Sequence, residues 1–297
     1  IKRCKEDVVF DAACFIILTL VLFVVAYPLY WVIISSISAP SAVSSGKVLL
    51  HPIGFTLKGY AEVFKNDQVM RGFLNSLIIT FCGVMVNLIV TLPTSYALSR
   101  SNFSGKKPIT IFYLITMFFG GGLIPTYLVI QRLQMLNTIW ALILPGCLSV
   151  YNMIVARTFF KSNISEELYE AAEIDGCTQA RFFFQIALPL SKAIIAILVL
   201  YYGVGHWNSY FSALVYISDK AKYPLQLVLR NILITNQTAL SQTATTAAAR
   251  AALQEKQQLI DVMKYSLIII SSIPVLVMYP LVQKHFVKGV MIGSMKG

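Results

Sequence analysis

Acidic residues are scarce in this chain and gather in one short stretch. Five of the thirteen carboxylates lie within residues 166–175, and the long segments on either side contain none. The cluster consists of Glu166, Glu167, Glu170, Glu173 and Asp175. A group of carboxylates on a short polar helix can bind a complementary surface of another molecule. This cluster therefore predicts binding to a partner rather than catalysis.

The residues around this cluster predict a helix, a turn and a second helix. Ser165 can cap the first helix, whose first turn then holds carboxylates where the helix dipole favours negative charge. Gly176 can end that helix in a left-handed turn, and Thr178 can begin the next one. Ala171 and Ala172 leave one face of the first helix thin. We therefore predict a surface that docks into a groove on a soluble partner, with an ordinary amphipathic surface helix as the alternative.

Motifs for catalysis or for metal binding are absent from the sequence. It contains no Ser/His/Asp or Cys/His set typical of a hydrolase, and its three histidines are isolated from one another. The five cysteines show no CxxC or Cys/His spacing, so neither a zinc site nor a disulfide framework is indicated. We predict a protein that is not an enzyme and that holds no metal or cofactor of its own.

The composition indicates an integral membrane protein. Hydrophobic residues make up 57% of the chain and charged residues 12%, and the mean hydropathy is +0.71. A soluble domain would carry about 25% charged residues. Seven uncharged runs reach the roughly 18–20 residues that span a bilayer, but the run at 231–249 is rich in Thr, Gln, Asn and Ser. We therefore predict an all-α fold with six transmembrane helices in a single domain (1–297), at about 8–37, 73–98, 108–130, 137–159, 187–217 and 265–283.

Basic residues set the predicted orientation. The net charge of +11 comes from residues that flank the spans, where anionic lipid headgroups attract them, and no basic patch with interleaved aromatic residues predicts nucleic-acid binding. The short turn from Arg100 to Lys107 holds three basic residues and no acid, which favours a cytoplasmic position for this turn and for both termini. The first apolar run is too long for a cleaved signal peptide, so we expect it to remain as the first span. The remaining segments are a cytoplasmic loop (160–186), an outer loop (219–261) and a cytoplasmic tail (285–297).

The interiors of the predicted spans carry no charge, and this limits the mechanism. Charged residues occur within the spans only near the cytoplasmic ends, at Asp11, Arg157 and Lys192. Proton-coupled carriers and voltage sensors need ionisable groups inside the bilayer, so we expect the driving energy to enter from outside it. The chain has no GxxxxGK[ST] phosphate loop with which to hydrolyse ATP itself.

The predicted span 187–217 carries a second informative cluster, a group of aromatic and polar side chains. Aromatic rings stack on the apolar face of a pyranose, and amide or imidazole groups bond to its hydroxyls. We interpret five residues as a candidate substrate pathway: Tyr202, His206, Trp207, Asn208 and Tyr210. An interfacial aromatic belt with helix packing is the alternative. The nearby Gly203 and Gly205 allow an unwound midpoint in this span.

Glycine, proline and amide residues predict further irregularities. The three glycines at 120–122 predict a loosened outer end of the third span, with a break that brings the backbone close to another chain or to substrate as the alternative. Pro145 and Gly146 predict a kink in the fourth span. The amides of Asn75 and Asn87 in the second span predict contacts with a neighbouring helix.

The spacing in the acidic region also resembles a known motif. The chain reads Glu170-Ala171-Ala172, three residues, Gly176, nine residues, Ile186, one residue, and Leu188-Pro189. This matches at every position the EAA loop of binding-protein-dependent ABC import permeases, in which the loop forms a coupling helix that sits in a cleft of the ATPase subunit. The resemblance therefore implies a set of ATPase-coupling residues: Glu170, Ala171, Ala172, Asp175, Gly176, Leu188 and Pro189.

Further stretches resemble the same family, so that the likeness covers nearly the whole chain: 121–146, 205–230 and 283–293. They are similar to carbohydrate-type permeases of the maltose-permease branch, and among these to permeases for complex oligosaccharides. The resemblance implies a type I ABC importer permease fold in the bacterial cytoplasmic membrane. It implies as partners a homologous second permease subunit, a pair of ATPases that bind ATP and Mg, and an extracytoplasmic solute-binding protein. It also implies that the tail at 289–297 reaches between the ATPases, and that the partner permease can be the subunit that holds the sugar.

Together, these features predict a permease subunit that imports an oligosaccharide or another carbohydrate by alternating access. Closure of the ATPase pair would move the docked loop at 166–185, and the permease pair would rock from inward-facing to outward-facing. Two alternatives remain open from the sequence. One is a self-sufficient channel or facilitator, and the other is an ABC permease for a non-sugar solute such as an amino acid or a metal.

Overall fold

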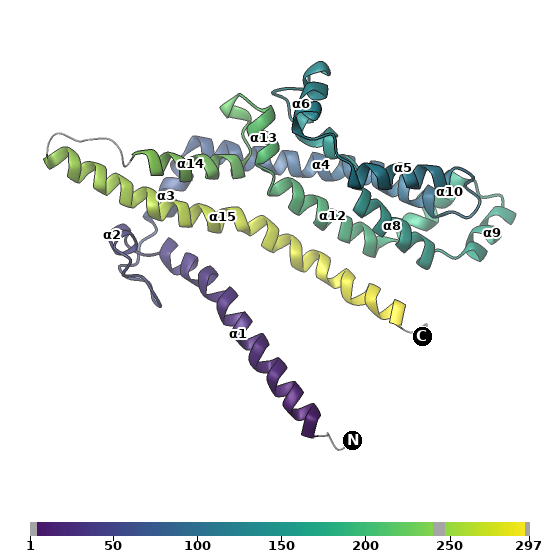
Figure 1. The fold of residues 1–297 in the computed structure, drawn as a ribbon, viewed down its shortest axis with the longest axis horizontal. Coiled ribbons are helices and arrows are strands. Elements are labelled where there is room, and N and C mark those ends of the chain that lie inside the picture. Colours follow the sequence, from purple (N-terminus) through teal and green to yellow (C-terminus); the bar gives the residue numbers. More distant parts are fainter. Residues whose placement is uncertain (1–4, 240–246, 295–297) are drawn as a thin grey trace. The chain divides into compact units, whose positions relative to one another are not determined.

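The computed structural model of the protein describes residues 5–239 and 247–294. These residues form helices and connecting segments, and none of them lies in a strand. Contacts group the chain into two compact units, one of Ile1–Met70 with Leu229–Ser272 and one of Arg71–Val228 with Ile273–Gly297. Figure 1 labels the elements. The all-helical fold expected from the sequence is confirmed, and the single domain (1–297) stays a prediction.

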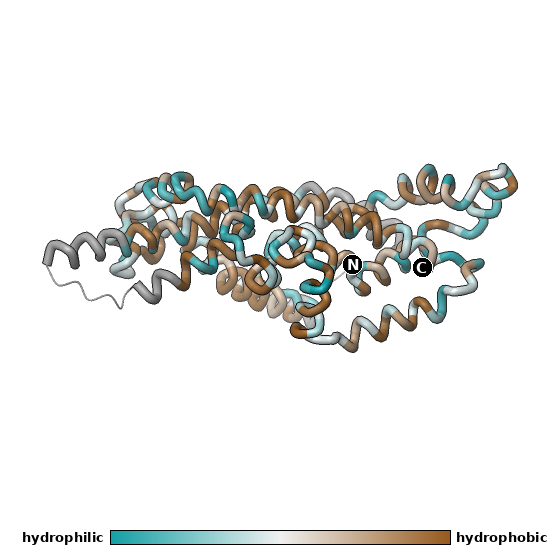
Figure 2. Tube along the Cα trace, turned by 90° about the horizontal axis from the view of Figure 1, so that it is seen from above, coloured by the Kyte–Doolittle hydropathy of each residue, from teal (hydrophilic) through white to brown (hydrophobic). Residues whose placement is uncertain are grey.

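Helix length and composition agree with a chain that crosses a membrane. Within residues 5–239 and 247–294, three helices are long and apolar enough to span it, and up to six spans result if each of three bent helix pairs counts as one. The continuous candidates are Val9–Ser36, Asp67–Ser99 and Gln257–Pro280. In Figure 2, brown hydrophobic stretches run along the long helices, whereas teal hydrophilic residues gather near helix ends and in connecting segments. The protein is therefore an integral membrane protein, as its composition predicts.

In the first unit, α1 (Lys5–Ser36) forms the first span. Its most apolar window has none of its residues buried, so this surface is available to lipid or to another subunit. Near its end, three aromatic side chains donate hydrogen bonds to consecutive backbone oxygens of the following segment. These bonds join Trp31 to Val48 at 2.8 Å, Tyr27 to Leu49 at 3.3 Å and Tyr30 to Leu50 at 2.6 Å. The helix end is thereby tied to the segment after α2 (Pro40–Ser44).

The remaining helices of this unit are α3 (Lys58–Lys65) and parts of α14 (Leu225–Ala239) and α15 (Ala247–Ser294). Gly59 of α3 packs closely on α15, because a Cβ atom there would lie 2.5 Å from Ser266 Oγ. Because α14 and the start of α15 fall within it, the predicted outer loop (219–261) is largely helical. Its residues 240–246 lie outside the described residues. Helix α15 runs through Pro274 and Pro280 beyond the predicted span, so the predicted tail (285–297) has a helical backbone to Ser294. Residues 295–297 lie outside the described part.

Helix α4 (Asp67–Ser99), which lies in the second unit from Arg71 onward, presents a face of small and polar residues to its neighbours there. Ser76, Gly83, Asn87, Thr91 and Ser95 are all buried and follow one another at intervals of seven, four, four and four residues. This is the spacing of one helix face. The face lets α4 approach other helices closely and offers them hydrogen-bonding groups.

Two predicted spans of this unit are bent helix pairs. Helices α5 (Lys106–Phe118) and α6 (Leu123–Arg132) meet at 114°, at the glycines 120–122, and Gly122 has a φ of +86°. The expectation of a merely loosened helix end is wrong, because left-handed backbone at a glycine turns the chain through more than a right angle. The predicted kink at Pro145 is confirmed. There, α7 (Trp140–Ile143) and the 3₁₀ turn η1 (Leu144–Gly146) meet α8 (Val150–Asn163) at 52°.

The fifth predicted span (187–217) also consists of several helices. They are α11 (Leu188–Leu190), α12 (Lys192–Trp207) and α13 (Phe211–Tyr216), followed by the 3₁₀ turn η3 (Lys220–Lys222). A bend of 80° separates the segment Gln179–Leu190 from α12. Gly203 and Gly205 lie inside the continuous helix α12, so the predicted unwinding there is wrong. Gly203 instead lets Met278 of α15 pack against the helix backbone.

Between α8 and α11, the chain forms α9 (Glu166–Ile174), α10 (Gln179–Phe182) and the π-helix η2 (Phe183–Ala187). The core of the second unit joins these elements to α4, α8 and α12 through Tyr96, Phe160, Tyr169, Phe182 and Leu198, all of them buried. Helix α9 lies at one end of this unit, beyond α8 and α10 (Figure 1). The acidic cluster is therefore carried at the tip of a packed helical body.

Candidate functional site

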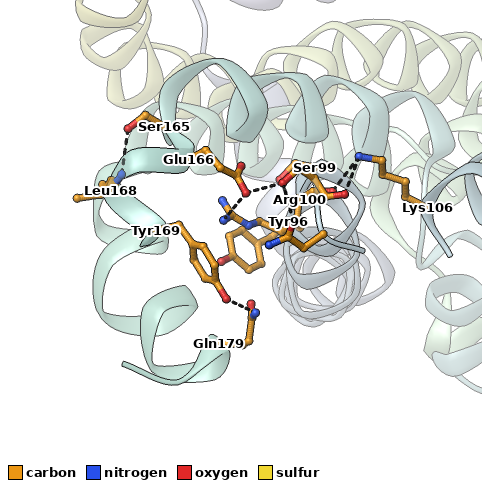
Figure 3. Close-up of polar contacts among 11 residues, drawn as sticks. Tyr96, Ser99, Arg100, Lys106, Ser165, Glu166, Leu168, Tyr169 and Gln179 are labelled. Atoms are coloured by element: carbon orange, nitrogen blue, oxygen red, sulfur yellow. Dashed lines mark hydrogen bonds and ion pairs between the residues drawn. The ribbon is translucent and has the colours of Figure 1, made fainter. Parts of the chain in front are cut away.

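The first end of α9 is formed by the residues that the sequence singles out. The Ser165 hydroxyl accepts a hydrogen bond from the Leu168 backbone N–H at 3.3 Å, which caps the helix (Figure 3). Glu166 and Glu167 occupy the first turn, where unpaired N–H groups favour negative charge. The predicted cap and the predicted acidic first turn are both present.

The other end of α9 closes in a Schellman motif. The backbone N–H of Cys177 donates to the Ala172 carbonyl at 2.9 Å, and that of Gly176 donates to the Glu173 carbonyl at 3.0 Å. Gly176 has a φ of +77°, with no heavy atom within 4 Å of a Cβ placed there. A side chain at this position would therefore cost backbone strain of about 1–2 kcal/mol and meet no steric clash. Thr178 then caps α10 by accepting from the Arg181 N–H at 3.3 Å.

A single aromatic side chain fixes α9 to the core. Tyr169 is 3% exposed, and its ring meets the Phe182 ring edge-on at a centroid distance of 5.2 Å. Its hydroxyl is hydrogen-bonded to the Gln179 amide across the turn. Tyr169 thus places the inner side of α9 against α10 and leaves the other side of the helix free.

Arg100, in the turn after α4, makes a second connection to α9. Its guanidinium carbon lies 3.9 Å from the Tyr169 ring centroid, and its Nη2 atom lies 3.2 Å from Glu166 Oε1. Figure 3 shows the guanidinium between these two side chains. The Glu166 side chain is 40% exposed, so the ion pair alone contributes about 1 kcal/mol or less. The contact with the buried Tyr169 ring is desolvated and can contribute about 2 kcal/mol, so it is the larger effect.

Neighbouring groups hold the Arg100 turn in shape. The Ser101 hydroxyl donates to the same Glu166 Oε1 atom at 2.5 Å. The Lys106 ammonium donates to the backbone oxygens of Arg100 and Ser101, each at 3.2 Å. The turn therefore presents two side-chain donors to one carboxylate of α9, and its own backbone carbonyls are satisfied.

The predicted coupling residues divide into a group on the α9 helix and turn and a group at the base of this segment. Glu170, Ala171, Asp175 and Gly176 are exposed together on α9 and its C-terminal turn. Among the described residues, no salt bridge involves the carboxylates of Glu170 or Asp175. Ile174 joins this surface with 87% of its area exposed, which is unusual for a large apolar side chain outside the membrane-spanning helices. We call this surface, made of these five residues, the α9 face.

The other three predicted coupling residues lie outside the α9 face. Ala172 and Leu188 are half-buried against the core, and Pro189 is exposed in α11, just before the bend into α12. Their positions suit a structural role in closing the turn and redirecting the chain. The structure thus brings together four of the seven predicted residues on one accessible surface.

The predicted substrate cluster of α12 has a different character. The Tyr202 side chain is 6% exposed, and its hydroxyl is hydrogen-bonded to the Thr91 hydroxyl at 2.7 Å and to the Ser149 N–H at 3.2 Å. Trp207 is 2% exposed and packs edge-on against Phe73, with 5.6 Å between ring centroids. Both side chains therefore serve helix packing in this conformation.

His206 also bonds within the protein, whereas the last two residues of the cluster are exposed. The His206 Nε2 atom lies 2.7 Å from Asn87 Oδ1, and the Asn87 amide donates to the Gly146 carbonyl at 2.8 Å. This confirms the helix contact predicted for Asn87. Asn208 and Tyr210 are exposed at the end of α12 and in the segment after it. A substrate pathway along this helix stays a prediction, and these two residues are the accessible part of it.

Sequence reasoning missed Arg100, Ser101 and Tyr169. Tyr169 stands next to the Glu170-Ala171-Ala172 motif but is not part of it, and Arg100 was interpreted only as a marker of orientation. Arg100 and Glu166 are 66 positions apart, so no local pattern could connect them. Within the described part of the chain, no group of three or more His, Cys, Asp or Glu side chains could hold a metal ion.

The sequence of this chain is similar to that of known transport proteins. No protein-family profile matches it. The polygalacturonan/rhamnogalacturonan transport system permease protein YtcP of Bacillus subtilis (strain 168) is 36% identical over 288 residues, which cover 97% of this chain and 98% of YtcP. The protein LplC of the same organism is 38% identical over 293 residues, which cover 99% of this chain and 97% of LplC. Both alignments therefore extend over nearly the full length of the two proteins compared.

A solved structure is similar over almost the whole chain. It is the crystal structure of a bacterial ABC transporter involved in the import of the acidic polysaccharide alginate. The matched chain has a TM-score of 0.85 and 27% sequence identity, and the match covers 96% of this chain and 99% of that one. At this coverage the likeness is one of the entire fold.

Proposed function

Because this chain belongs to the family of ABC transporter permease proteins that serve sugar and oligosaccharide transport systems, we propose that it imports a carbohydrate and is driven through α9. Its fold is that of an ABC importer permease. The chain is a transport subunit, and in this proposal ATP and Mg are bound and ATP is hydrolysed by separate ATPase subunits. An oligosaccharide is the favoured substrate. YtcP is named for polygalacturonan and rhamnogalacturonan, and the similar structure is that of a transporter involved in the import of alginate.

The observation that carries the proposal is the α9 face on its rigid base. The face is accessible, acidic and partly apolar, and the helix beneath it is fixed by a cap, a Schellman turn and a buried tyrosine. Such a surface suits a groove on a soluble protein, which the apolar Ile174 would enter while the carboxylates meet basic groups at the rim. A docked ATPase pair could then move α9 as a lever and switch the permease between inward-facing and outward-facing states.

The proposed orientation places α9 in the cytoplasm. The contact of Arg100 with Glu166 brings the basic turn after α4 and the acidic helix to the same end of the second unit. The three basic residues of that turn, Arg100, Lys106 and Lys107, favour the cytoplasmic side. The proposed ATPases would also be in the cytoplasm. The basic turn and the docking role of α9 therefore both favour a cytoplasmic position for this end of the second unit. The remaining partners in the proposal are a homologous second permease subunit and an extracytoplasmic solute-binding protein.

A charge reversal tests the docking role. In cells that express the complete system, Glu170→Lys should lower uptake of the sugar that the cognate receptor binds by at least about tenfold, because a repelled α9 no longer follows the ATPase. The matched control is Asp67→Lys. Asp67 is also exposed, and it begins α4 at the end of that helix away from Arg100. This variant should leave uptake within about twofold of wild type. Wild-type uptake in Glu170→Lys membranes with an intact complex would contradict the proposal.

Purification provides an independent test of the partners. The wild-type protein extracted in mild detergent should co-isolate with a second permease and an ATPase. A homo-oligomer without an ATPase would instead identify a facilitator. The Glu170→Lys and Asp67→Lys variants should differ in the yield of co-isolated ATPase if the α9 face forms the contact.

A further inference from the structure

We propose that Arg100 is a positioning residue that joins α9 rigidly to the end of α4, so that a displacement of the docked helix is passed to α4. This inference rests on the proposed function, because it assumes that α9 is the element on which the ATPase acts. It assigns a role to a residue outside the EAA-like motif and outside the α9 face. The connecting side chains are Arg100, Ser101, Glu166 and Tyr169, and we call them the Arg100 clamp.

The clamp matters because the backbone connections at the two ends of α9 would by themselves allow the helix to pivot. Only Ile164 and Ser165 separate α9 from the end of α8, and Ile164 has an extended backbone with a φ of −110° and a ψ of 98°. At its other end, α9 is joined to α10 by the turn at Gly176. Single residues with non-helical backbone are where hinges form. A side-chain link from another helix removes this freedom.

The geometry of the clamp prevents both rotation and sliding. Two donors from the turn after α4 converge on one oxygen of Glu166, with Arg100 at 3.2 Å and Ser101 at 2.5 Å. The flat guanidinium group also lies over the Tyr169 ring at 3.9 Å. One contact is at the start of α9 and the other is one turn further along the helix. Two attachments on one helix fix its direction as well as its position.

The stacked half of the clamp, Arg100 on Tyr169, is buried and should remain formed during movement. The Arg100 residue is 8% exposed and Tyr169 is 3% exposed. The rings of Tyr96 and Phe182 lie near the same guanidinium, with their centroids 5.9 and 6.0 Å from the Arg100 Cζ atom. Arginine suits this place because its planar group can stack on a ring and donate to a carboxylate at once, whereas the lysine ammonium is a point charge.

Beyond the clamp, α4 is already connected to the rest of the second unit. Asn87, Thr91 and Ser95 of its buried face are hydrogen-bonded to the Gly146 carbonyl, the Tyr202 hydroxyl and the Met153 carbonyl at 2.8, 2.7 and 3.0 Å. A force applied at the Arg100 end of α4 therefore reaches α8 and α12 through existing bonds. The clamp adds a direct side-chain link between α9 and the end of α4, next to the packing of Tyr169 on Phe182.

The test measures directly whether α9 and α4 move as one body. Spin labels are attached at Glu167→Cys on α9 and Ile89→Cys on α4, both exposed positions, in a complex whose native cysteines are replaced. The complete transporter is placed in lipid nanodiscs, and label distances are recorded without nucleotide and with ATP and vanadate. Neither probe depends on knowing the sugar. In the otherwise wild-type complex, the distance distribution should be the same in both states.

Three variants make the result specific. Arg100→Ala should broaden the distribution or shift it between the two nucleotide states, and Arg100→Lys should fall between Arg100→Ala and wild type. The matched control is Arg157→Ala, because Arg157 is at the same end of the unit and donates to the Leu98 carbonyl at 3.0 Å. It belongs to no part of the clamp and should leave the distribution unchanged. Transported sugar per ATP hydrolysed should fall about tenfold in Arg100→Ala and less than about twofold in Arg157→Ala.

A chemical replacement of the clamp keeps the proposal testable if Arg100→Ala weakens the fold. Cysteines at Ser101 and Glu166 in the Arg100→Ala background without the label sites, joined by a short bismaleimide, should restore the transport ratio. A cross-linked complex that stays uncoupled would overturn the proposal, as would an Arg100→Ala complex with an unchanged distance distribution. If Arg100→Ala behaves like wild type while Glu170→Lys is inactive, only the clamp is rejected. If Glu170→Lys is also active, the docking role itself fails.

Discussion

On α9 the carboxylates and small residues that stand out in the sequence lie on an accessible surface, whereas on α12 most of the aromatic and polar residues that stand out are turned into the protein. Glu170 and Asp175 form no salt bridge within the described chain, but Tyr202 and His206 each have short hydrogen bonds to α4. For both clusters the sequence predicts partners outside the chain, with an ordinary surface helix as the alternative for α9 and helix packing as the alternative for α12. The difference shows that the fold leaves one polar cluster accessible and pairs most of the other with neighbouring helices.

The two regions also differ in how they are held. Helix α9 is short and owes its shape to local chemistry at both ends, together with the Tyr169 and Arg100 contacts. Helix α12 is long and apolar, and its polar groups are bonded to residues more than fifty positions away in the chain. A substitution on α9 should therefore act mainly on coupling, and one on α12 mainly on stability.

The largest effect is expected from Gly176→Val. A β-branched side chain at a φ of +77° disrupts the Schellman turn, and the resulting change at the α9 face should lower sugar uptake by at least about tenfold. The matched control is Gly205→Ala on α12, which also has no heavy atom within 4 Å but has ordinary helical backbone. It should preserve uptake within about twofold and stabilise the protein by at most about 1 kcal/mol. Equal uptake by the two variants would remove the contrast between the regions.

The next effect concerns the base of α9. Tyr169→Ala deletes a buried ring and should lower the free energy of unfolding by about 3–5 kcal/mol, together with the yield of co-isolated ATPase. Tyr169→Phe keeps the ring under Arg100 and loses only the bond to Gln179, which should cost about 1 kcal/mol. Thermal unfolding of the purified complex and its ATPase content measure both quantities. Similar losses from Phe and Ala would show that the hydroxyl, and not the stacked ring, holds the helix.

The smallest effect is expected on α12. Tyr202→Phe removes the bonds to Thr91 and Ser149 and should lower the free energy of unfolding by about 1–3 kcal/mol while the KM for uptake stays the same. The exposed Asn208 gives the comparison, because Asn208→Ala should leave stability within about 0.5 kcal/mol. If Asn208 contacts the sugar, the KM should rise in that variant alone. A raised KM in Tyr202→Phe at unchanged stability would place Tyr202 in the pathway after all.

The features predicted correctly from the sequence arise from short-range chemistry. Ser165 caps a backbone N–H three residues away, and Gly176 is required by the turn in which it stands. Among the described residues, up to six candidate spans follow from composition and length, three as continuous helices and three as bent helix pairs. The kink at Pro145 follows from the missing N–H and the ring of proline. In each case the cause and the structure lie within a few residues of one another.

The features that could not be predicted depend on distant parts of the chain. Arg100 and Glu166 approach only because α4 and α9 meet in the folded unit, and Tyr202 and Thr91 are 111 residues apart. Glycines at 120–122 permit a sharp turn, but the angle of 114° also depends on which distant helices each arm contacts, α8 for α5 and α7 and α13 for α6. The same limit applies to the aromatic residues of α12, since rings that pack helices and rings that bind sugars have the same sequence pattern.

The most direct test of the central claim asks what the α9 face touches. A photo-reactive amino acid placed at Ala171 in the wild-type system should cross-link the ATPase subunit on illumination, because this residue lies at the centre of the exposed surface. The same group at Phe184, an exposed residue of η2 outside that surface, should not cross-link the ATPase. Cross-linking of the ATPase from Ala171 alone is the expected result. Equal cross-linking from both sites, or none from Ala171 in an intact complex, would contradict the account.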